Sequence, residues 1–302
     1  MMQSVSVVIP TLGRPSLGRA VQSVLDQTRP VDEIIVVADT DTPVTLPSDA
    51  RITLSVNRFR EGPAKCRQLG IDAARGSVIA LLDDDDEWHR TKLERQLGAV
   101  GDAEAGTHWI ASSRVVALGP GDRRRIWPRR IIEPAGSVAE YLFRFSDLRF
   151  GGAVLQTSTL CFPADLGRMI RWDAHVGTVH DEPSWLLDVQ RAVPDVRVIQ
   201  LPDVLSTYNV ANASVSRQRS DRTGSYIDWG LEYLRSESAR VRGDYLCTSP
   251  VSAAVSAGSL RGVRCSLQSA FRHGRPGPCA VGYAVLSAAR IVLNRASSAV
   301  RR

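Results

Sequence analysis

The segment Val78–Trp88 constrains the fold of this 302-residue chain most, because five apolar residues in it run directly into four consecutive aspartates. An apolar run as long as Val78–Leu82 is typical of a strand that is buried on both faces of a parallel sheet. The acidic run that follows consists of Asp83, Asp84, Asp85 and Asp86. Ligands of open α/β sheets bind outside the carboxyl ends of the strands, so this run marks a candidate binding site.

Four adjacent carboxylates repel one another unless a positive charge lies among them. A hard divalent cation, Mg²⁺ or Mn²⁺, is the natural candidate, since such ions bind one or two carboxylates together with substrate phosphates. The alternative is a solvated acidic helix start, where the helix dipole favours negative side chains. The direct junction with a buried strand favours the cation.

The first 88 residues alternate strand and helix patterns, which predicts an α/β fold with a parallel sheet. The predicted strands are Ser4–Pro10, Glu33–Ala38, Ile52–Val56 and Val78–Leu82. The predicted helices are Gly62–Ala74 and a segment capped by Ser16, whose apolar face is Leu17, Ala20, Val21, Val24 and Leu25. The second strand also ends in acids, Asp39 and Asp41, so both acidic ends should lie at one edge of the sheet.

The remaining chain is less regular, and its expected elements are as follows. We expect helices at His89–Val100, at Ser137–Phe145 and after His180, where Pro183 suits a first helical turn and Trp185, Leu186, Val189 and Val193 form an apolar face. We expect strands at His108–Leu118, within Gly151–Phe162, at Val196–Leu201 and at Leu205–Val210. Loops are expected at Gly119–Arg130 and through Trp172 and Asp173, and helices beyond Asn212.

Composition limits the class of protein. The formal net charge is +6, but 36 of the 38 basic residues are arginine, a bias that we attribute to base composition of the genome rather than to nucleic-acid binding. The five cysteines are widely spaced and form no C-x-x-C pair, which indicates neither a disulfide framework nor a zinc site. The sequence has no signal-peptide pattern and no apolar run long enough to span a bilayer, so we expect a cytoplasmic protein.

Five segments resemble the family 2 glycosyltransferases of the GT-A fold, in the order and at the spacing of that family, over roughly residues 4–210: VVIPTLGRP, EIIVVADTD, GPAKCRQLGIDAA, LLDDDDEW and VHDEPSWLL. The resemblance implies a mainly parallel sheet flanked by helices. It implies a nucleotide-sugar-binding half at 1–105 and an acceptor and catalytic half of the same domain at 106–212. The helical pattern beyond Asn212 predicts a helical C-terminal extension at 213–302. The resemblance also implies inverting transfer from a nucleotide-diphosphate sugar, with a UDP-sugar as the first candidate, and dependence on Mn²⁺ or Mg²⁺.

The resemblance assigns roles residue by residue. Pro10 and Thr11 match the loop that frames the base, Asp39 the acid that hydrogen-bonds it, and Arg67 the basic residue near the nucleotide. Asp83 matches the acid that faces the ribose, Asp85 the metal ligand and Asp181 the catalytic base, whereas Asp84 fills a variable position. His180, Glu182 and Trp185 lie near the acceptor side in this assignment, and Arg14 lies near the phosphates.

The chemistry of such a transfer needs the same residue types without reference to the family. Inversion requires a base on the acceptor side, and the transition state resembles an oxocarbenium ion. The leaving diphosphate develops charge that a metal ion can neutralise. Two acid groups that are distant in sequence are therefore required, and Asp83–Asp86 and Asp181–Glu182 supply them.

Each assignment has a simpler alternative. Asp39 and Asp41 could cap a turn, and Arg67 and Arg14 could be solvated. Asp181 could be the N-cap before Pro183. Glu182 could be the base instead, and Trp185 could belong to the core. Two other functions also remain open: a sugar nucleotidyltransferase and a non-catalytic nucleotide-sugar-binding module. The former usually carries a Gly-rich basic loop after the first strand, whereas this chain has TLGRP there.

The C-terminal segment has one usable pattern. Apolar residues recur at helical spacing at Val281, Val285, Ala288, Ala289, Val292, Ala296 and Val300, and Arg290, Arg295, Arg301 and Arg302 lie largely off this stripe. Such a helix could rest on an anionic membrane near a lipid-linked acceptor. Packing on the rest of the chain, or on a second subunit, is the alternative.

Overall fold

The computed structural model describes residues 3–57, 59–101, 108–119, 121, 123–148, 151–172, 179–209 and 221–300, with side chains described as far as residue 294. The chain divides into two compact units. The N-terminal unit contains Met1–Gly136 and Ala153–Asn212, and the C-terminal unit contains Ser137–Gly152 and Ala213–Arg302. Residues 137–152 therefore group with the C-terminal helices, which the sequence pattern does not reveal.

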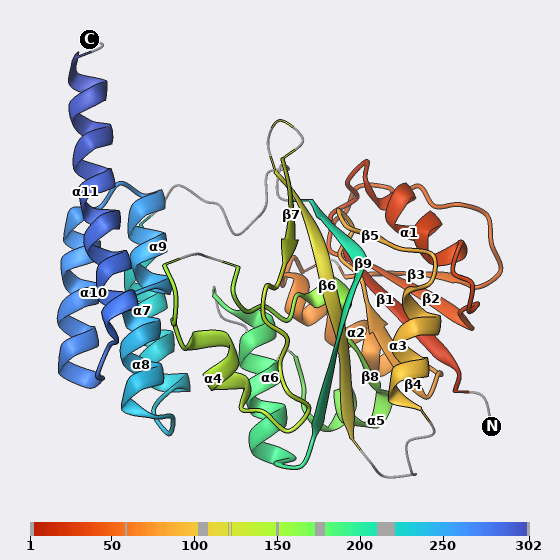
Figure 1. The fold of residues 1–302 in the computed structure, drawn as a ribbon. Helices are drawn as coiled ribbons and strands as arrows, with labels where there is room; N and C mark the ends of the chain where they lie inside the picture. Colours follow the sequence, from red (N-terminus) through yellow and green to blue (C-terminus); the bar gives the residue numbers. More distant parts are fainter. Residues whose placement is uncertain are drawn as a thin grey trace. The chain divides into compact units, whose positions relative to one another are not determined.

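The N-terminal unit is built on one mixed sheet (Figure 1), with strand order β3-β2-β1-β4-β8-β6-β9-β5 in the described residues and β7 paired to β6. Its strands are β1 Val5–Thr11, β2 Glu33–Ala38, β3 Ile52–Val56, β4 Val78–Leu81, β5 Glu87–Trp88, β6 Trp109–Gly119, β7 Arg123–Trp127, β8 Cys161–Pro163 and β9 Arg197–Asn209. Its helices are α1 Leu17–Leu25, α2 Pro63–Ala73, α3 Lys92–Val100, α5 Ala164–Met169 and α6 Asp181–Ala192, with the 3-10 turn η1 Thr157–Thr159. The four strands β3, β2, β1 and β4 are parallel, as predicted for an α/β fold.

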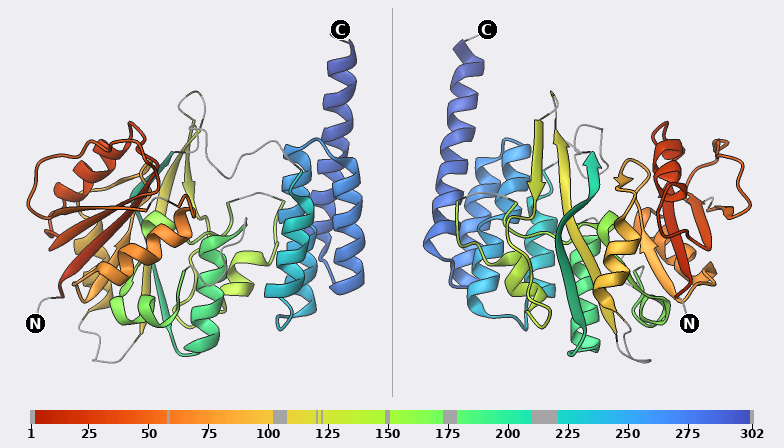
Figure 2. Two further views of the ribbon diagram at one scale, coloured as in Figure 1. Left: turned by 180° about the vertical axis from the view of Figure 1, so that it is seen from behind. Right: turned by 45° about the vertical axis from the view of Figure 1, so that its right-hand side comes forward.

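Alternate side chains of the buried strands divide the core into two faces. Val5, Val7 and Ile9 of β1 pack in one cluster with the apolar faces of α1 and α3. On the other face, α2 approaches β1 so closely that a Cβ on Gly70 would lie 2.3 Å from Val8 Cγ1. Glycine at position 70 is therefore what lets this helix pack directly on the strand, and Figure 2 shows α2 on the side opposite α1.

Several predicted elements differ from the observed ones. The predicted loop Gly119–Arg130 contains the strand β7, which pairs antiparallel with β6. An arginine-rich segment is compatible with an exposed edge strand, because charged side chains there discourage pairing with other chains. The side chain of Ser16 makes no capping hydrogen bond to α1, and the helix predicted from His89 begins only at Lys92.

The second half shows two further differences. The predicted strands Val196–Leu201 and Leu205–Val210 are one strand, β9, whose pairing with β6 shifts register where Pro202 and Asp203 intervene. Such a bulge lets a strand contain a proline, which cannot donate to the ladder. Within Gly151–Phe162 only the short β8 is extended, and the predicted loop beyond it contains α5. Val210 and Asp173 lie outside the described residues.

The C-terminal unit is helical, as predicted, with α4 Val138–Phe143, α7 Thr223–Tyr233, α8 Ala239–Leu246, α9 Ser249–Ser256, α10 Leu260–His273 and α11 Pro278–Val300. The carboxylate of Asp244 is fully buried and accepts hydrogen bonds from the backbone N–H groups of Phe145 (3.1 Å) and Gly277 (2.6 Å) and from Arg240 Nε (3.0 Å). The ring of Phe143 packs edge-on against Tyr245 at 5.2 Å. These contacts explain why residues 137–152 belong to this unit.

Lys92 is fully buried in the N-terminal unit. Its Nζ donates to Gln96 Oε1 at 2.7 Å and lies 4.1 Å from the centre of the Trp88 ring. Burial lowers the pKa of Lys92 from 10.5 to about 8. Between these two pH values the unfolded chain binds more protons than the folded one, so this group makes the free energy of unfolding rise with pH.

We expect Lys92→Met to remove this pH dependence. The stability of the wild type relative to the variant should increase between pH 7.5 and pH 10, by on the order of 2–3 kcal/mol for a pKa shift of this size. Thermal or urea unfolding of both proteins across this range measures the difference, and Lys65→Met, at the other lysine of the sequence, is the control. A difference that stays constant with pH would contradict the titration of Lys92.

Candidate active site

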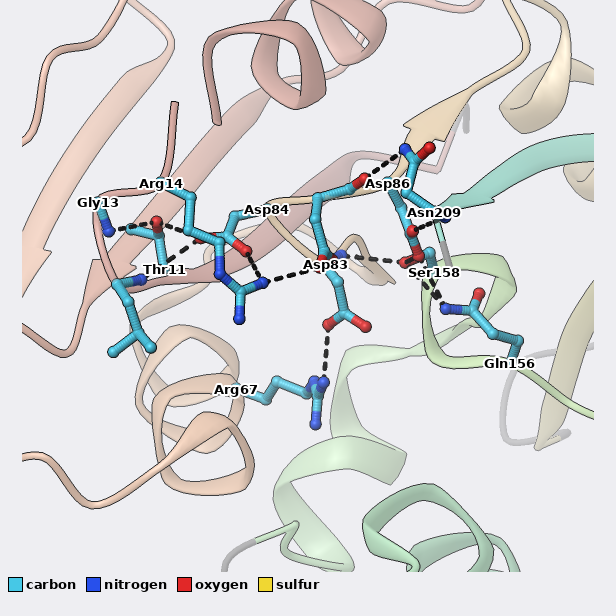
Figure 3. A network of polar contacts seen from close by, with 12 residues as sticks. Thr11, Gly13, Arg14, Arg67, Asp83, Asp84, Asp86, Gln156, Ser158 and Asn209 are labelled. Carbon is cyan, nitrogen blue, oxygen red and sulfur yellow. Dashed lines mark hydrogen bonds and ion pairs between the residues drawn. The ribbon is translucent and has the colours of Figure 1, made fainter. Parts of the chain in front are cut away.

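The acidic ends of β2 and β4 lie at the same edge of the sheet. β1 lies between them and is parallel to both, so the three strands present their carboxyl ends together, as predicted. The backbone N–H of Asp39 donates to the carbonyl oxygen of Thr11 at 2.8 Å, which joins the end of β2 to the end of β1. Of the aspartates after β4, Asp84 lies against the loop after β1, whereas Asp83 and Asp86 point to other segments (Figure 3). Pro10 is buried within β1.

Asp84 and Arg14 form the first part of this network. Thr11 Oγ1 donates to Asp84 Oδ2 at 2.6 Å, and Arg14 Nη1 donates to Asp84 Oδ1 at 3.0 Å and to Asp85 Oδ2 at 2.8 Å. Burial raises the pKa of Asp84, and the contacts with Thr11 and Arg14 oppose that rise. Arg14 therefore pairs with two of the four aspartates, a role that neither alternative considered for it anticipated.

Arg67 forms the second part and connects two distant segments. The residue is 5% exposed, so the alternative that it is solvated is wrong. Its Nη2 donates to Asp83 Oδ1 at 2.7 Å, and its Nη1 lies 3.9 Å from Asp181 Oδ2. Its guanidinium carbon lies 5.3 Å from the centre of the Trp172 ring. One buried guanidinium thus stands between the acid after β4 and the acid at the start of α6.

The start of α6 has an unusual backbone. His180 occupies the N-cap position with φ 60° and ψ 48°, the left-handed region that non-glycine residues seldom adopt. Asp181 is the first residue of the helix, so the alternative that it is the N-cap is wrong. Burial raises the pKa of the neighbouring Glu182, while Arg67 opposes this rise. The two acids that compete for the role of base therefore experience the same arginine.

Trp185 lies in the core. Its side chain stacks on Trp172 with ring centres 4.8 Å apart and contacts Phe162 at 4.6 Å, and its Nε1 donates to the carbonyl oxygen of Ile170 at 2.8 Å. Only 2% of the residue is exposed. This burial favours the core alternative over a platform for a sugar ring, and Trp185 supports the site through Trp172.

Asp86, to which the sequence assigns no separate role, anchors the acidic loop. It accepts hydrogen bonds from Ser158 Oγ (2.7 Å), Gln156 Nε2 (2.8 Å) and the backbone N–H of Asn209 (3.0 Å), and it is 1% exposed (Figure 3). Burial, with the nearby charge of Asp83, raises the pKa of Asp86 well above its usual range. The only signal for Asp86 was its place in the run of four aspartates; Gln156, Ser158 and Asn209 carried none.

Asp39 holds the chain that enters α2. Its Oδ1 accepts from Asn57 Nδ2 at 3.0 Å and from the backbone N–H of Glu61 at 3.2 Å, and its Oδ2 accepts from the N–H of Gly62 at 2.8 Å. Gly62 is the N-cap of α2 and has φ 91°, which glycine adopts without strain. Asp39 therefore holds residues 57, 61 and 62, which is more than the simple turn cap considered as its alternative.

The exposed part of the site is acidic. The side chains of Asp83, Asp85 and Asp181 are 22%, 14% and 23% exposed, whereas Asp84 and Asp86 are buried. Burial and the charge of Asp83 raise the pKa of Asp85, so its negative charge is incompletely balanced. A cation beside Asp85 would therefore be favoured electrostatically.

The donor set suits a metal ion that shares its ligands with a phosphate group. Within the described ranges, no group of three or more His, Cys, Asp or Glu side chains is arranged to hold a metal ion. Mg²⁺ is commonly bound by one or two carboxylates together with phosphates and waters, and Asp85 and its neighbours fit that arrangement.

Comparison with known proteins identifies relatives of this chain. Residues 6–152 match the model of the family described as "Glycosyl transferase family 2". The amylovoran biosynthesis glycosyltransferase AmsB of Erwinia amylovora is 28% identical over 189 residues, which cover 62% of this chain and 58% of that protein. The Escherichia coli protein named UDP-Glc:alpha-D-GlcNAc-diphosphoundecaprenol beta-1,3-glucosyltransferase WfaP is 33% identical over 102 residues, or 32% of this chain and 41% of that protein. The chain thus covers less than two thirds of each relative.

Solved structures share the fold. S. aureus TarS, residues 1–349, superposes with a TM-score of 0.62 at 12% identity and covers 90% of this chain and 81% of the TarS chain. The mannosyltransferase PcManGT from Pyrobaculum calidifontis, in complex with GDP-Man and Mn²⁺, superposes with a TM-score of 0.54 at 17% identity, covering 99% and 81%. At such identities the likeness concerns the fold alone. The family match over residues 6–152, together with the relatives, identifies this part of the chain as a member of glycosyl transferase family 2.

Proposed function

We propose that the protein is an inverting glycosyltransferase that moves a sugar from a nucleotide-diphosphate sugar to an acceptor hydroxyl group. Membership of the family supports sugar transfer, and the names of the relatives support a nucleotide-sugar donor. A sugar nucleotidyltransferase is disfavoured by the same family match. A UDP-sugar is the first donor to test, since the donor in the name of WfaP is UDP-Glc.

The observation that carries this proposal is the position of Arg67 between Asp83 and Asp181. The donor and the acceptor must meet within a few ångströms for transfer, so the acid on the donor side and the base on the acceptor side must lie close together. Arg67 contacts Asp83 at 2.7 Å and lies 3.9 Å from Asp181, although the two acids are 98 residues apart in the chain. This closeness is what inverting transfer needs.

In the proposed reaction, Asp181 accepts the proton of the acceptor hydroxyl as its oxygen attacks the anomeric carbon of the sugar. The bond from that carbon to the diphosphate oxygen breaks, and its electron pair leaves with the nucleoside diphosphate. Attack from the face opposite the leaving group inverts the configuration. Arg67, held between Asp83 and Asp181, orients both carboxylates, and Arg14 lies close enough to Asp85 to contact the phosphates as well.

We propose Asp85 as the metal ligand and Mn²⁺ or Mg²⁺ as the ion. When bound, such an ion neutralises the charge that develops on the leaving diphosphate. Pro10, Thr11 and Asp39 would surround the base, and Asp83 and Asp84 would lie near the ribose and the phosphates. Because Asp84 already binds Thr11 and Arg14, we assign it the part of orienting those two residues.

For the acceptor we propose a lipid-linked sugar, because the acceptor in the name of WfaP is a diphosphoundecaprenol-linked sugar. We further propose that the enzyme works in the cytoplasm. Within the part of the chain that the structure describes, no helix is both long and apolar enough to cross a bilayer. We assign contact with the acceptor to His180 and Glu182, which flank the proposed base at the start of α6.

We expect Asp39→Ala to weaken donor binding and to lower the melting temperature together. The carboxylate holds Asn57 and the backbone of residues 61 and 62, so its loss releases this wall of the pocket as well as a hydrogen bond to the base. A loss of about 1–3 kcal/mol corresponds to a roughly 5- to 150-fold rise in the dissociation constant of the nucleotide. Calorimetry measures this dissociation constant. Asp41→Ala, an exposed acid two residues away, is the control, and unchanged affinity in Asp39→Ala would refute the assignment.

One experiment tests the proposed function as a whole. UDP, GDP, dTDP and CDP are screened with Mn²⁺ for a rise in melting temperature, since a ligand of the native state alone stabilises it. The sugar nucleotides of the best base are then assayed for release of nucleoside diphosphate in the presence of membrane lipid extract. Stabilisation without release, for every donor and acceptor extract tried, would indicate a non-catalytic binding module. The absence of any stabilisation would contradict nucleotide binding itself.

A further inference from the structure

The positive charge of this protein is concentrated at its C-terminal end. Residues 245–302 contain eight arginines and no aspartate or glutamate. The other 244 residues carry 30 Lys and Arg against 32 Asp and Glu, so they are close to neutral. Arg261, Arg264, Arg272, Arg275 and Arg290 of this segment are all exposed. The net positive charge of the chain therefore comes entirely from residues 245–302.

The helix α11 buries one part of its surface and exposes part of the apolar stripe seen in its sequence. Its buried residues are Ala280, Ala284, Ser287 and Ile291, and Ala284 and Ile291 contact the cluster of Val251, Ala254 and Val263. Of the apolar stripe seen in the sequence, which could pack on the chain or rest on a membrane, Ala288 packs on this cluster, whereas Val285 and Val292 are 57% and 51% exposed. Apart from Ile291, the buried residues of α11 up to residue 294 are small, and several larger aliphatic residues are exposed.

The exposed face of α11 is apolar and contains an arginine. It consists of Val285, Leu286, Ala289, Val292 and Leu293, with Leu286 60% and Leu293 66% exposed. Arg290 lies four residues after Leu286 and three before Leu293, so helical spacing puts it on the same face. The C-terminal turns of α11 also extend beyond the neighbouring helices of this unit (Figures 1 and 2).

We infer that the exposed face of α11 binds the surface of an anionic lipid bilayer. Helices that lie in a membrane interface combine an apolar stripe, which enters the acyl boundary, with basic residues that attract anionic headgroups. Arg290 can extend its guanidinium to the headgroups while its methylenes lie along the apolar stripe. An acid-free segment of 58 residues provides the matching charge.

The positive charge argues against two other partners for the exposed face of α11, a second copy of the chain and a nucleic acid. A symmetric dimer through this face would bring two acid-free, arginine-rich segments together, and like charges across an interface are unfavourable. A nucleic acid would use the arginines, but it gains little from exposed leucines and valines, since bases stack on aromatic rings. Lipid is the partner that uses both the aliphatic side chains and the arginines.

Vesicle co-sedimentation tests the inference without any sugar donor, so its outcome is independent of transfer. The protein is mixed with vesicles of phosphatidylcholine with or without phosphatidylglycerol, at low and high salt. We expect binding only to the anionic vesicles, and weaker binding at high salt because charge attraction is screened. In the double variant Leu286→Glu, Leu293→Glu this binding should fall by roughly tenfold or more, since the apolar stripe is interrupted by charge.

Two controls accompany this variant. Met169→Glu places the same charge on a residue that is 52% exposed in α5 of the N-terminal unit, and it should bind like the wild type. Arg272→Gln with Arg290→Gln keeps the apolar stripe and should weaken binding to the anionic vesicles. Circular dichroism and the melting temperature establish that each variant is folded.

Several results would overturn the inference. One is the absence of binding to anionic vesicles, and another is binding that the stripe variant and the arginine variant leave unchanged. Light scattering of the free protein tests the remaining alternative, in which a second copy of the chain binds this face. A wild-type dimer that dissociates in Leu286→Glu, Leu293→Glu would identify the exposed face of α11 as a contact between two copies of the chain.

Discussion

Asp181→Asn should fold normally, bind donor and metal about as well as the wild type, and transfer sugar roughly 10²–10⁴-fold more slowly, which is the usual scale of general-base catalysis. Asparagine keeps the size of the side chain and its place at the start of α6 but removes its basicity. The helix N-terminus favours a negative charge at this position, so the wild-type carboxylate is suited to accept a proton. Steady-state transfer rates measured at saturating donor, beside nucleotide affinities from calorimetry, separate catalysis from binding.

Two further variants, Glu182→Gln and Asp188→Asn, test whether Asp181 itself is the base. Glu182→Gln should have a smaller effect, because burial raises the pKa of Glu182 and so favours its protonated form, which cannot accept a proton. Asp188→Asn changes an acid of similar exposure on the same helix, paired with Arg191, and should be near wild type. A nearly active Asp181→Asn with an inactive Glu182→Gln would move the role of base to Glu182. Full activity of both would place the base elsewhere.

Asp85→Ala should reduce transfer by about 10³-fold or more, since a metal ion supplies several kcal/mol of charge stabilisation in the transition state. It should also abolish the part of nucleoside diphosphate affinity that depends on Mn²⁺. Calorimetric titration with UDP, or with the diphosphate that best stabilises the protein, in the presence of Mn²⁺ or of EDTA measures that part directly. Because burial raises the pKa of Asp85, the metal-dependent affinity should weaken as the pH falls and this carboxylate takes up a proton.

Glu87→Ala is the matched control for Asp85→Ala. Glu87 lies two residues further along, its side chain is 37% exposed, and it contacts Arg19 at 3.4 Å rather than the aspartate network. It should bind Mn²⁺ and nucleotide like the wild type. Full activity of the wild-type enzyme in EDTA would remove the metal from the mechanism and leave charge stabilisation to Arg14 and Arg67.

Local sequence patterns were sufficient wherever one segment determines its own environment. The apolar runs of β1, β2 and β4 are buried on both faces, and their length and composition alone predict strands at a sheet centre. Because parallel strands share a direction, the acids that follow β2 and β4 were predictable neighbours. The strand predicted within Gly151–Phe162 is only the short β8, and the arginine-rich β7 escaped prediction because it is extended only through pairing with β6.

The sequence by itself determined the α/β class, the acidic edge of the sheet and the residue types that sugar transfer requires. Only the tertiary structure decided how those charges are partnered. Four adjacent aspartates look equivalent in the sequence, yet Asp83 binds Arg67, Asp84 and Asp85 bind Arg14, and Asp86 is buried among Gln156, Ser158 and Asn209. The physical reason is that a charge is stabilised by whatever lies within a few ångströms of it, and those neighbours come from segments up to 123 residues away in the chain.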